Sequence, residues 1–188
     1  MKIVVDTCGG DKKVQEVVKG AIKSLSFNKD FKVVLVGPEE EINSALKDLS
    51  YDKERVEVVN STEVITCNDA PMEAIRKKPD SSLIKACKVL KEDEDAKAFV
   101  STGSTGAVLA SGIFKVGRID GVLRPALAPL IPTLTGGKVM LIDSGANVDC
   151  KKENLVQFAL MGSSYMQKVE KISKPRVALI SNGTEDKK

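Results

Sequence analysis

The feature that most constrains the fold is the alternation of short apolar β-type runs with helical patterns. Runs rich in Val, Ile and Leu fall at residues 2–6, 31–36, 55–59, 96–100, 138–143 and 176–180. Apolar residues recur at helical spacing in most of the intervening segments. These segments are residues 13–26, 39–49, 72–78, 81–91, 107–116 and 153–169. The alternation predicts an open, mostly parallel sheet with helices on both faces.

No linker or shift in composition divides the chain, so we predict a single α/β domain over residues 1–188. Residues 126–133 contain Pro129 and Pro132 and are expected to form an edge strand or an irregular segment. The last predicted strand leads into a Gly-containing turn at residues 181–188 with no helix after it. We therefore expect the domain to be incomplete and to continue in a longer protein.

Composition narrows the class of protein. Apolar residues make up 42% of the chain, aromatic residues 4%, and the formal net charge is only +3. These values favour a globular protein and argue against nucleic-acid binding, which needs a basic face or stacking aromatics. There is no histidine, and none of the four cysteines forms a C-x-x-C pair. Histidine-based catalysis and zinc binding therefore lack support, and scattered cysteines favour a reduced, cytoplasmic protein. No apolar run is long enough for a transmembrane helix.

The turn Ser101–Gly106 is the first candidate site, because it joins a predicted strand to the start of a small-residue helix. A helix N-terminus offers unpaired N–H groups and partial positive charge, which suit an anion such as phosphate. Ser and Thr are also ordinary helix caps, and the glycines could serve backbone geometry alone. Both interpretations remain open for this turn considered by itself.

Four polar turns follow predicted strands and combine Gly with Asp, Asn, Ser or Thr. They are residues 6–11, 101–106, 143–149 and 182–188. In open α/β sheets, ligands bind beyond the carboxyl ends of the strands, so we expect these turns to form one site. The alternative is that strand-to-helix turns are simply enriched in these residue types.

Charged side chains could complete such a site. Arg76 and Arg124 suit bidentate contact with phosphate oxygens, although the cluster Arg76–Lys78 could also be a solvated helix end. Four aspartates in or near the turns could bind a metal, orient donors or cap helices, and we favour capping or orientation: Asp6, Asp11, Asp143 and Asp149. No activated nucleophile is evident. Phosphate could itself be the nucleophile, which requires positioning and donors for a developing oxyanion.

The sequence resembles the PlsX family, the acyl-[acyl-carrier-protein]:phosphate acyltransferases of bacterial phospholipid synthesis. The resemblance covers essentially the whole chain and rests on many ordered blocks. These blocks are Val5-Asp6 with Gly9-Gly10-Asp11, Glu63-Val64-Ile65, Asp69-x-Pro71, Arg76-Lys77-Lys78 with Ser81-Ser82, Ser101-x-Gly103-x-Thr105-Gly106-Ala107, Val116-Gly117-Arg118-Ile119, Arg124-Pro125-Ala126-Leu127-Ala128-Pro129, Asp143-x-Gly145-Ala146-Asn147-Val148-Asp149, Met161-Gly162-Ser163 and Gly183-Thr184-Glu185.

The resemblance implies a three-layer α/β/α, Rossmann-like fold related to phosphotransacetylases. It implies that phosphate attacks the thioester of acyl-acyl carrier protein and releases acyl-phosphate. From the residues themselves, we expect no cofactor and no metal. The resemblance also implies a cytoplasmic homodimer with peripheral membrane association. Lys188 matches the lysine of the family block G-T-E-x-x-K and is the catalytic candidate. The candidate substrate- and phosphate-binding residues are Ser101, Gly103, Ser104, Thr105, Gly106, Arg76, Arg124, Asp6, Gly9, Gly10, Asp143, Asn147 and Thr184.

The chain departs from the family pattern in two blocks. Lys12 and Val14 stand where the family usually has His and Pro, and Ser104 replaces an Asn. Two other functions are compatible with the residues: a phosphotransacetylase that acts on acyl-CoA, and a non-catalytic phosphate- or nucleotide-binding module. The absence of a nucleotide-binding fingerprint counts against nucleotides.

Overall fold

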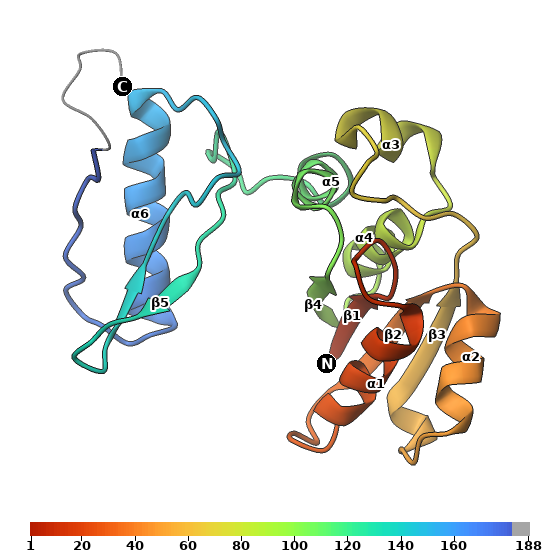
Figure 1. Ribbon diagram of the computed structural model, residues 1–188. Helices are drawn as coiled ribbons and strands as arrows, with labels where there is room; N and C mark the ends of the chain where they lie inside the picture. The colour runs from red at the N-terminus through yellow and green to blue at the C-terminus, as the bar shows by residue number, and fades with distance from the viewer. Residues whose placement is uncertain (182–188) are drawn as a thin grey trace. The chain divides into compact units, whose positions relative to one another are not determined.

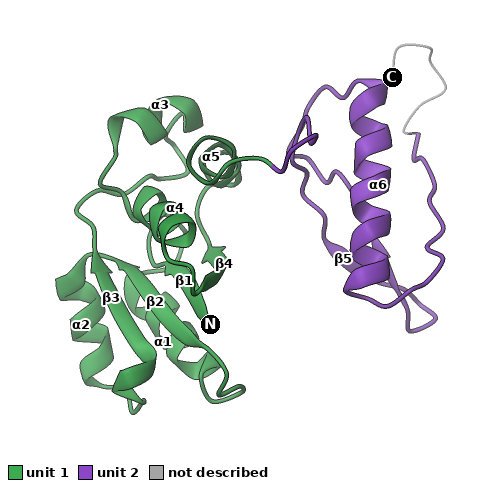
Figure 2. Ribbon diagram, turned by 180° about the vertical axis from the view of Figure 1, so that it is seen from behind, with its two compact units in different colours: residues 1–118 green, residues 119–188 purple. Residues whose placement is uncertain are grey.

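The computed structural model describes residues 1–181. The chain divides into two compact units, Met1–Arg118 and Ile119–Lys188 (Figure 2). The first unit contains a parallel sheet with its helices, and the second contains a β-hairpin and a long helix. The prediction that residues 1–188 form one domain stays a prediction.

The first unit is built on a four-stranded sheet in which all neighbouring strands run parallel (Figure 1). Its strands are β1 (Lys2–Asp6), β2 (Lys32–Gly37), β3 (Val56–Asn60) and β4 (Ala96–Ser101). The spatial order is β3-β2-β1-β4, so the chain adds strands on one side of β1 and then crosses to the other. This order reverses direction between β1 and β4, where α/β sheets commonly bind ligands.

Helices cover both faces of this sheet. Successive side chains along a strand point to opposite faces, and both sets are apolar here, so both faces must be covered. Helices α1 (Val14–Ser24) and α2 (Glu39–Lys47) form a core with one set of strand residues that includes Val33 and Leu35. Helix α4 (Ser82–Glu92) belongs to the core that contains the alternate residues, such as Val34. The predicted three-layer α/β/α fold is therefore confirmed.

The remaining helices of the first unit are short. They are η1 (Lys53–Arg55), α3 (Pro71–Lys77), α5 (Thr105–Ser111) and η2 (Gly112–Val116), the last of which is π-helical. Helices α3, α4 and α5 share a third apolar cluster formed by small and branched side chains. Where the sequence predicted one helix over residues 107–116, the helix starts earlier, at Thr105, and changes its hydrogen-bond pattern at Gly112.

The second unit contains β5 (Leu130–Pro132), β6 (Lys138–Met140) and α6 (Lys152–Lys168). Strands β5 and β6 pair antiparallel, which agrees with the edge or irregular character predicted for residues 126–133. The predicted strand over residues 176–180 is wrong, because these residues are irregular. A strand needs a neighbour for its backbone hydrogen bonds, and no segment within residues 1–181 pairs with this one. The apolar pattern alone does not show whether a neighbouring strand is available for pairing.

Candidate functional site

The carboxyl ends of β1 and β4 bring together two of the predicted turns. Asp6 and Ser101, the last residues of these strands, are register partners in adjacent parallel strands. The loop after β1 (residues 7–13, the β1 loop) and the loop after β4 (residues 102–104, the β4 loop) therefore start side by side, at the place where the strand order reverses. This position is the expected location for a ligand in an open α/β sheet.

The Asp6 carboxylate links these two loops by hydrogen bonds. The Ser101 hydroxyl donates to Asp6 Oδ2 over 2.7 Å, and the Cys8 backbone N–H donates to Asp6 Oδ1 over 3.1 Å. Ser101 Oγ also accepts a hydrogen bond from the Gly103 N–H over 3.1 Å. One carboxylate thus fixes the start of the β1 loop directly and the start of the β4 loop through Ser101.

Asp6 is held in a protected environment. Only 2% of its surface is exposed, and burial raises the pKa of its carboxyl group above the ordinary value of 3.8. Hydrogen bonds from Ser82, Ser101 and the Cys8 backbone oppose that shift without cancelling it. Ser82 is the first residue of α4, so a helix start also contributes to this environment.

Glycines allow the β1 and β4 loops to approach closely. A Cβ atom at Gly10 would lie 2.7 Å from the Thr102 carbonyl oxygen, well inside van der Waals contact. Gly9 has φ +82°, and a Cβ atom there would lie 2.8 Å from the Ile65 carbonyl oxygen and 3.5 Å from Gly103 Cα. The glycine pair in the first turn is therefore required both by close approach and, at Gly9, by backbone conformation.

Within residues 1–181, backbone donors at the start of α5 have no acceptor. Ser104 occupies the N-cap position but makes no side-chain capping bond. Across residues 1–181, no group of the chain accepts a hydrogen bond from the N–H groups of Thr105 and Gly106. These donors lie directly after the β4 loop, so the arrangement can accept an oxyanion. Plain capping by Ser104, the alternative considered for this turn, does not occur.

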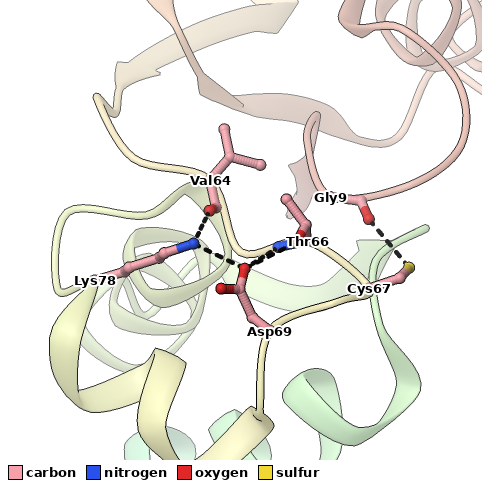
Figure 3. A network of polar contacts seen from close by, with 6 residues as sticks. All are labelled: Gly9, Val64, Thr66, Cys67, Asp69 and Lys78. Carbon is pink, nitrogen blue, oxygen red and sulfur yellow. Dashed lines mark hydrogen bonds and ion pairs between the residues drawn. The ribbon is translucent and has the colours of Figure 1, made fainter.

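A third segment, the connection from β3 to α3, borders the β1 loop. Figure 3 shows that Lys78 and Asp69 hold its shape. Lys78 Nζ lies 2.7 Å from Asp69 Oδ2 and donates to the Val64 carbonyl oxygen over 2.9 Å. Asp69 also accepts from the backbone and the hydroxyl of Thr66. The hydrogen bond from Lys78, followed by those from Thr66, lowers the pKa of Asp69 to about 2.

This connection contacts the β1 loop and α5. Cys67 Sγ lies 3.7 Å from the Gly9 carbonyl oxygen (Figure 3). A Cβ atom at Gly106 would lie 2.9 Å from Pro71 Cγ, so Gly106 permits close packing between α5 and α3. The sequence alone places Lys78 in a basic cluster and does not reveal its contacts with Asp69 and the Val64 carbonyl. The signal was present in Asp69, an acidic residue nine positions earlier that could pair with it.

Arg76 and Lys77 lie on the exposed side of α3. Arg76 Nε donates to the Met72 carbonyl oxygen over 3.2 Å, one turn back on the same helix. Lys77 pairs with Glu73 on the same helix. These contacts match the solvated helix end that the sequence analysis considered as an alternative. A contact of Arg76 with phosphate stays a prediction.

In the second unit, Asp143 organises the loop after β6. It accepts hydrogen bonds from the backbone of Leu127, Ala146 and Asn147 and from the Asn147 side chain, at 2.7 to 3.2 Å. Partial burial opposes ionisation of Asp143, but these donors outweigh it and hold its pKa below the ordinary value. Arg124 Nη1 donates to the Asp149 carbonyl oxygen over 3.0 Å.

These contacts hold the loop 143–149 together. They use Asp143 as an acceptor for neighbouring donors, which agrees with the orienting role favoured from the sequence. Because the loop follows an antiparallel strand of the second unit, its union with the β1 and β4 loops in one site stays a prediction. Within the described part of the chain, no group of three or more Cys, Asp or Glu residues is placed to hold a metal ion.

Comparison with known proteins identifies the family. The model of the family described as "Fatty acid synthesis protein" matches residues 1–188. The chain belongs to this family. Among curated proteins, it is 49% identical over 188 residues to the phosphate acyltransferase of Dictyoglomus thermophilum and 44% identical to that of Halothermothrix orenii. The phosphate acyltransferase of Caldanaerobacter subterraneus is 46% identical over the same length.

The match to these members of the fatty acid synthesis protein family covers all of this chain but only 54–58% of the relatives. The chain therefore spans about half the length of the curated relatives it matches. Family membership confirms the predicted resemblance. The matched region, residues 1–188, includes the β1 loop, the β4 loop and the loop 143–149.

Two predicted site residues of this family member, Thr184 and Lys188, lie outside the described residues. Their roles in substrate binding and catalysis stay predictions. Across residues 1–181, no helix combines the length and the apolar character needed to cross a bilayer.

Proposed function

We propose that the protein transfers a fatty acyl group from acyl-acyl carrier protein to inorganic phosphate and supplies acyl-phosphate for phospholipid synthesis. One observation carries the proposal. At the reversal point of the sheet, two glycine-containing loops meet, and the N–H groups of Thr105 and Gly106 have no acceptor within residues 1–181. The names of the relatives, phosphate acyltransferase, supply the reaction class.

In the proposed reaction, a phosphate oxygen attacks the thioester carbonyl carbon. A carbon–oxygen bond forms, the carbon–sulfur bond breaks, and the thiolate leaves and takes up the proton that the attacking hydrogen phosphate loses. The proposed phosphate-binding residues are Ser101, Gly103, Ser104, Thr105 and Gly106, with Arg76, Arg124, Asn147 and Thr184 as further contacts. Asp6, Gly9, Gly10 and Asp143 belong to the same proposed site. Lys188 stabilises the oxyanion that develops on the carbonyl oxygen. No metal or other cofactor takes part.

The proposed site needs no protein nucleophile. The Ser101 hydroxyl, at the end of β4, donates a hydrogen bond to Asp6 and accepts one from the Gly103 N–H. These bonds fix the orientation of the hydroxyl between the Asp6 carboxylate and the Gly103 amide. Because phosphate is itself a nucleophile, positioning it beside the thioester is sufficient, and we propose direct attack without a covalent acyl-enzyme.

The proposal extends to assembly and location. The protein acts as a homodimer in the cytoplasm, associates peripherally with the membrane, and has acyl-acyl carrier protein as its macromolecular substrate. Nucleic acid is not a partner, in keeping with the near balance of 29 basic and 26 acidic residues.

The full-length protein provides the test. It is incubated with long-chain acyl-acyl carrier protein with and without inorganic phosphate, and acyl-phosphate is trapped with hydroxylamine. We expect hydroxamate that depends on phosphate. No phosphate-dependent hydroxamate from either thioester would sink the proposal. Preferred turnover of acyl-CoA would indicate the phosphotransacetylase alternative, and phosphate binding without turnover of either donor would indicate a non-catalytic module.

A further inference from the structure

We infer that Asp6 is a positioning residue that sets the phosphate-binding loops through Ser101 and Cys8 and does not itself contact phosphate. This inference rests on the proposed function, because it assigns a role within the proposed phosphate site. The carboxylate reaches two segments that are far apart in sequence, since Asp6 and Ser101 are separated by 95 positions.

The geometry gives Asp6 control over both loops. Its two oxygens serve different loops, with Oδ1 accepting from the Cys8 N–H and Oδ2 accepting from the Ser101 hydroxyl. Ser101 in turn holds Gly103 in position, because the Ser101 oxygen accepts a hydrogen bond from the Gly103 N–H over 3.1 Å. The donors of Thr105 and Gly106 follow immediately. Their direction therefore depends on a chain of hydrogen bonds that starts at Asp6.

Because the β1 and β4 loops pack closely, the positions of the Thr105 and Gly106 donors should respond to small shifts of either loop. The β1 and β4 loops are in contact at two places, where Gly10 faces Thr102 and Gly9 faces Gly103. Because the loops touch, a shift of one displaces the other. A misplacement of about 1 Å in a binding site can cost roughly a hundredfold in rate, so small shifts of these donors matter.

Direct participation of Asp6 is a poorer explanation. Only 2% of its surface is exposed, which leaves little of the carboxylate for a ligand to touch. An ionised carboxylate beside a phosphate would also repel it. Both oxygens already accept from the protein, so the residue is better suited to orient donors than to take a proton from a substrate.

The test compares three variants of the full-length protein with the wild type: Asp6→Asn, Ser101→Ala and the double variant. Binding of inorganic phosphate is measured by calorimetric titration. KM for phosphate and KM for acyl-acyl carrier protein are measured separately. We expect each single variant to weaken phosphate binding roughly tenfold to a hundredfold, with KM for the acyl donor unchanged. The double variant should be about as weak as the weaker single variant, because both changes break one chain of bonds.

Two further variants distinguish a specific effect on the phosphate-binding loops from a general loss of protein stability. Ser101→Thr keeps the hydroxyl and should retain most of the phosphate affinity. Asp52→Asn is the matched control, since Asp52 also accepts the N–H of the residue two positions later, over 3.0 Å, but does so at the start of η1. It should leave phosphate binding at the wild-type level. If Asp6→Asn does not fold, as judged by thermal unfolding, Ser101→Ala and Ser101→Thr alone carry the comparison.

Several results would overturn the inference. They are unchanged phosphate affinity in Asp6→Asn and Ser101→Ala, independent additive losses in the double variant, or equal increases in both KM values. The titration does not depend on turnover. Wild-type protein that binds phosphate but makes no acyl-phosphate would therefore refute the proposed function and still test the role of Asp6. Wild-type protein that binds no phosphate would refute both.

Discussion

Asp6 and Asp143 organise loops in the same way but under opposite electrostatic conditions. Each follows a run of apolar residues, and each accepts backbone N–H groups from the loop that comes after it. Asp6 is almost fully buried and its pKa is raised, whereas Asp143 is half-buried and its pKa is lowered. Burial outweighs the donors at Asp6, and the donors outweigh burial at Asp143.

The difference follows from the surroundings of the two loops. The β1 loop is enclosed by the β4 loop and by the connection from β3 to α3, so its carboxylate is removed from water. The loop 143–149 is more open, and a Cβ atom at Gly145 would meet no atom within 4 Å. An aspartate at the end of β1 thus forms a buried link between two loops, and an aspartate three residues beyond β6 holds a more open loop together.

The largest effect should come from filling the space between the β1 and β4 loops. Gly10→Ala places a Cβ atom against the Thr102 backbone, and we expect a loss of about 3 kcal/mol in the free energy of unfolding. Gly145→Ala should cost only about 1 kcal/mol, from its backbone conformation at φ +113°. Urea denaturation measures both changes.

Gly20→Ala is the matched control for these two variants. Gly20 lies within α1, and a Cβ atom there would meet no atom within 4 Å, so alanine should stabilise the protein by about 0.5–1 kcal/mol. A cost for Gly10→Ala no greater than that of Gly145→Ala would contradict the view that the β1 loop is the enclosed one.

The next effect concerns Asp143 as a loop acceptor. Asp143→Ala removes the partner of the Leu127, Ala146 and Asn147 amides and should cost about 1–2 kcal/mol. Hydrogen exchange of these three amides should become faster, while exchange in the strands of the first unit should not change. Asp149→Ala serves as the control, because the Asp149 side chain is exposed and accepts no bond from another residue within 1–181. Unchanged exchange in Asp143→Ala would refute the organising role.

A pH titration should separate the two carboxylates directly. Carboxyl-carbon NMR should show Asp6 titrating above the ordinary value of 3.8 and Asp143 below it. The folded state therefore holds a proton on Asp6 more readily than the unfolded chain. The contribution of Asp6 to stability is greatest below about 3.8 and falls as the pH rises through its folded pKa.

Asp143 should show the opposite pH dependence. Its contribution to stability is present above 3.8 and is lost as the pH falls through its lower folded pKa. Asp143→Asn should therefore reduce the loss of stability on acidification below 3.8. Titration of both carboxyl groups on the same side of that value would remove the contrast between the two loops.

The smallest effect concerns the segment that borders the β1 loop. Lys78→Met removes the main cause of the low pKa of Asp69, so that pKa should rise from about 2 towards 3.8. Lys77→Met is the matched control, because Lys77 pairs with Glu73 on its own helix and should leave Asp69 unchanged. Carbon NMR of Asp69 measures both variants. A similar rise in both would mean that general positive charge, and not the contact with Lys78, sets the pKa.

By itself, the sequence determined the kinds of element and their order. Apolar periodicity is a local property, and it placed the first four strands and their helices within a few residues of their observed bounds. It also identified Asp6, the glycine pair and the Ser101–Gly106 turn as site candidates. It failed at residues 176–180, where apolar character was present but no neighbouring strand was available within residues 1–181.

Only the tertiary structure decided which of these residues meet. The order β3-β2-β1-β4 places Ser101 beside Asp6, and the packing of three segments buries that carboxylate and raises its pKa. The tertiary structure also decided that Lys78 contacts Asp69 and so holds the connection from β3 to α3 in shape. From the sequence, this connection was recognisable only as a polar segment. The physical reason is that strand order, burial and hydrogen-bond partners arise between segments distant in the chain, where local periodicity carries no information.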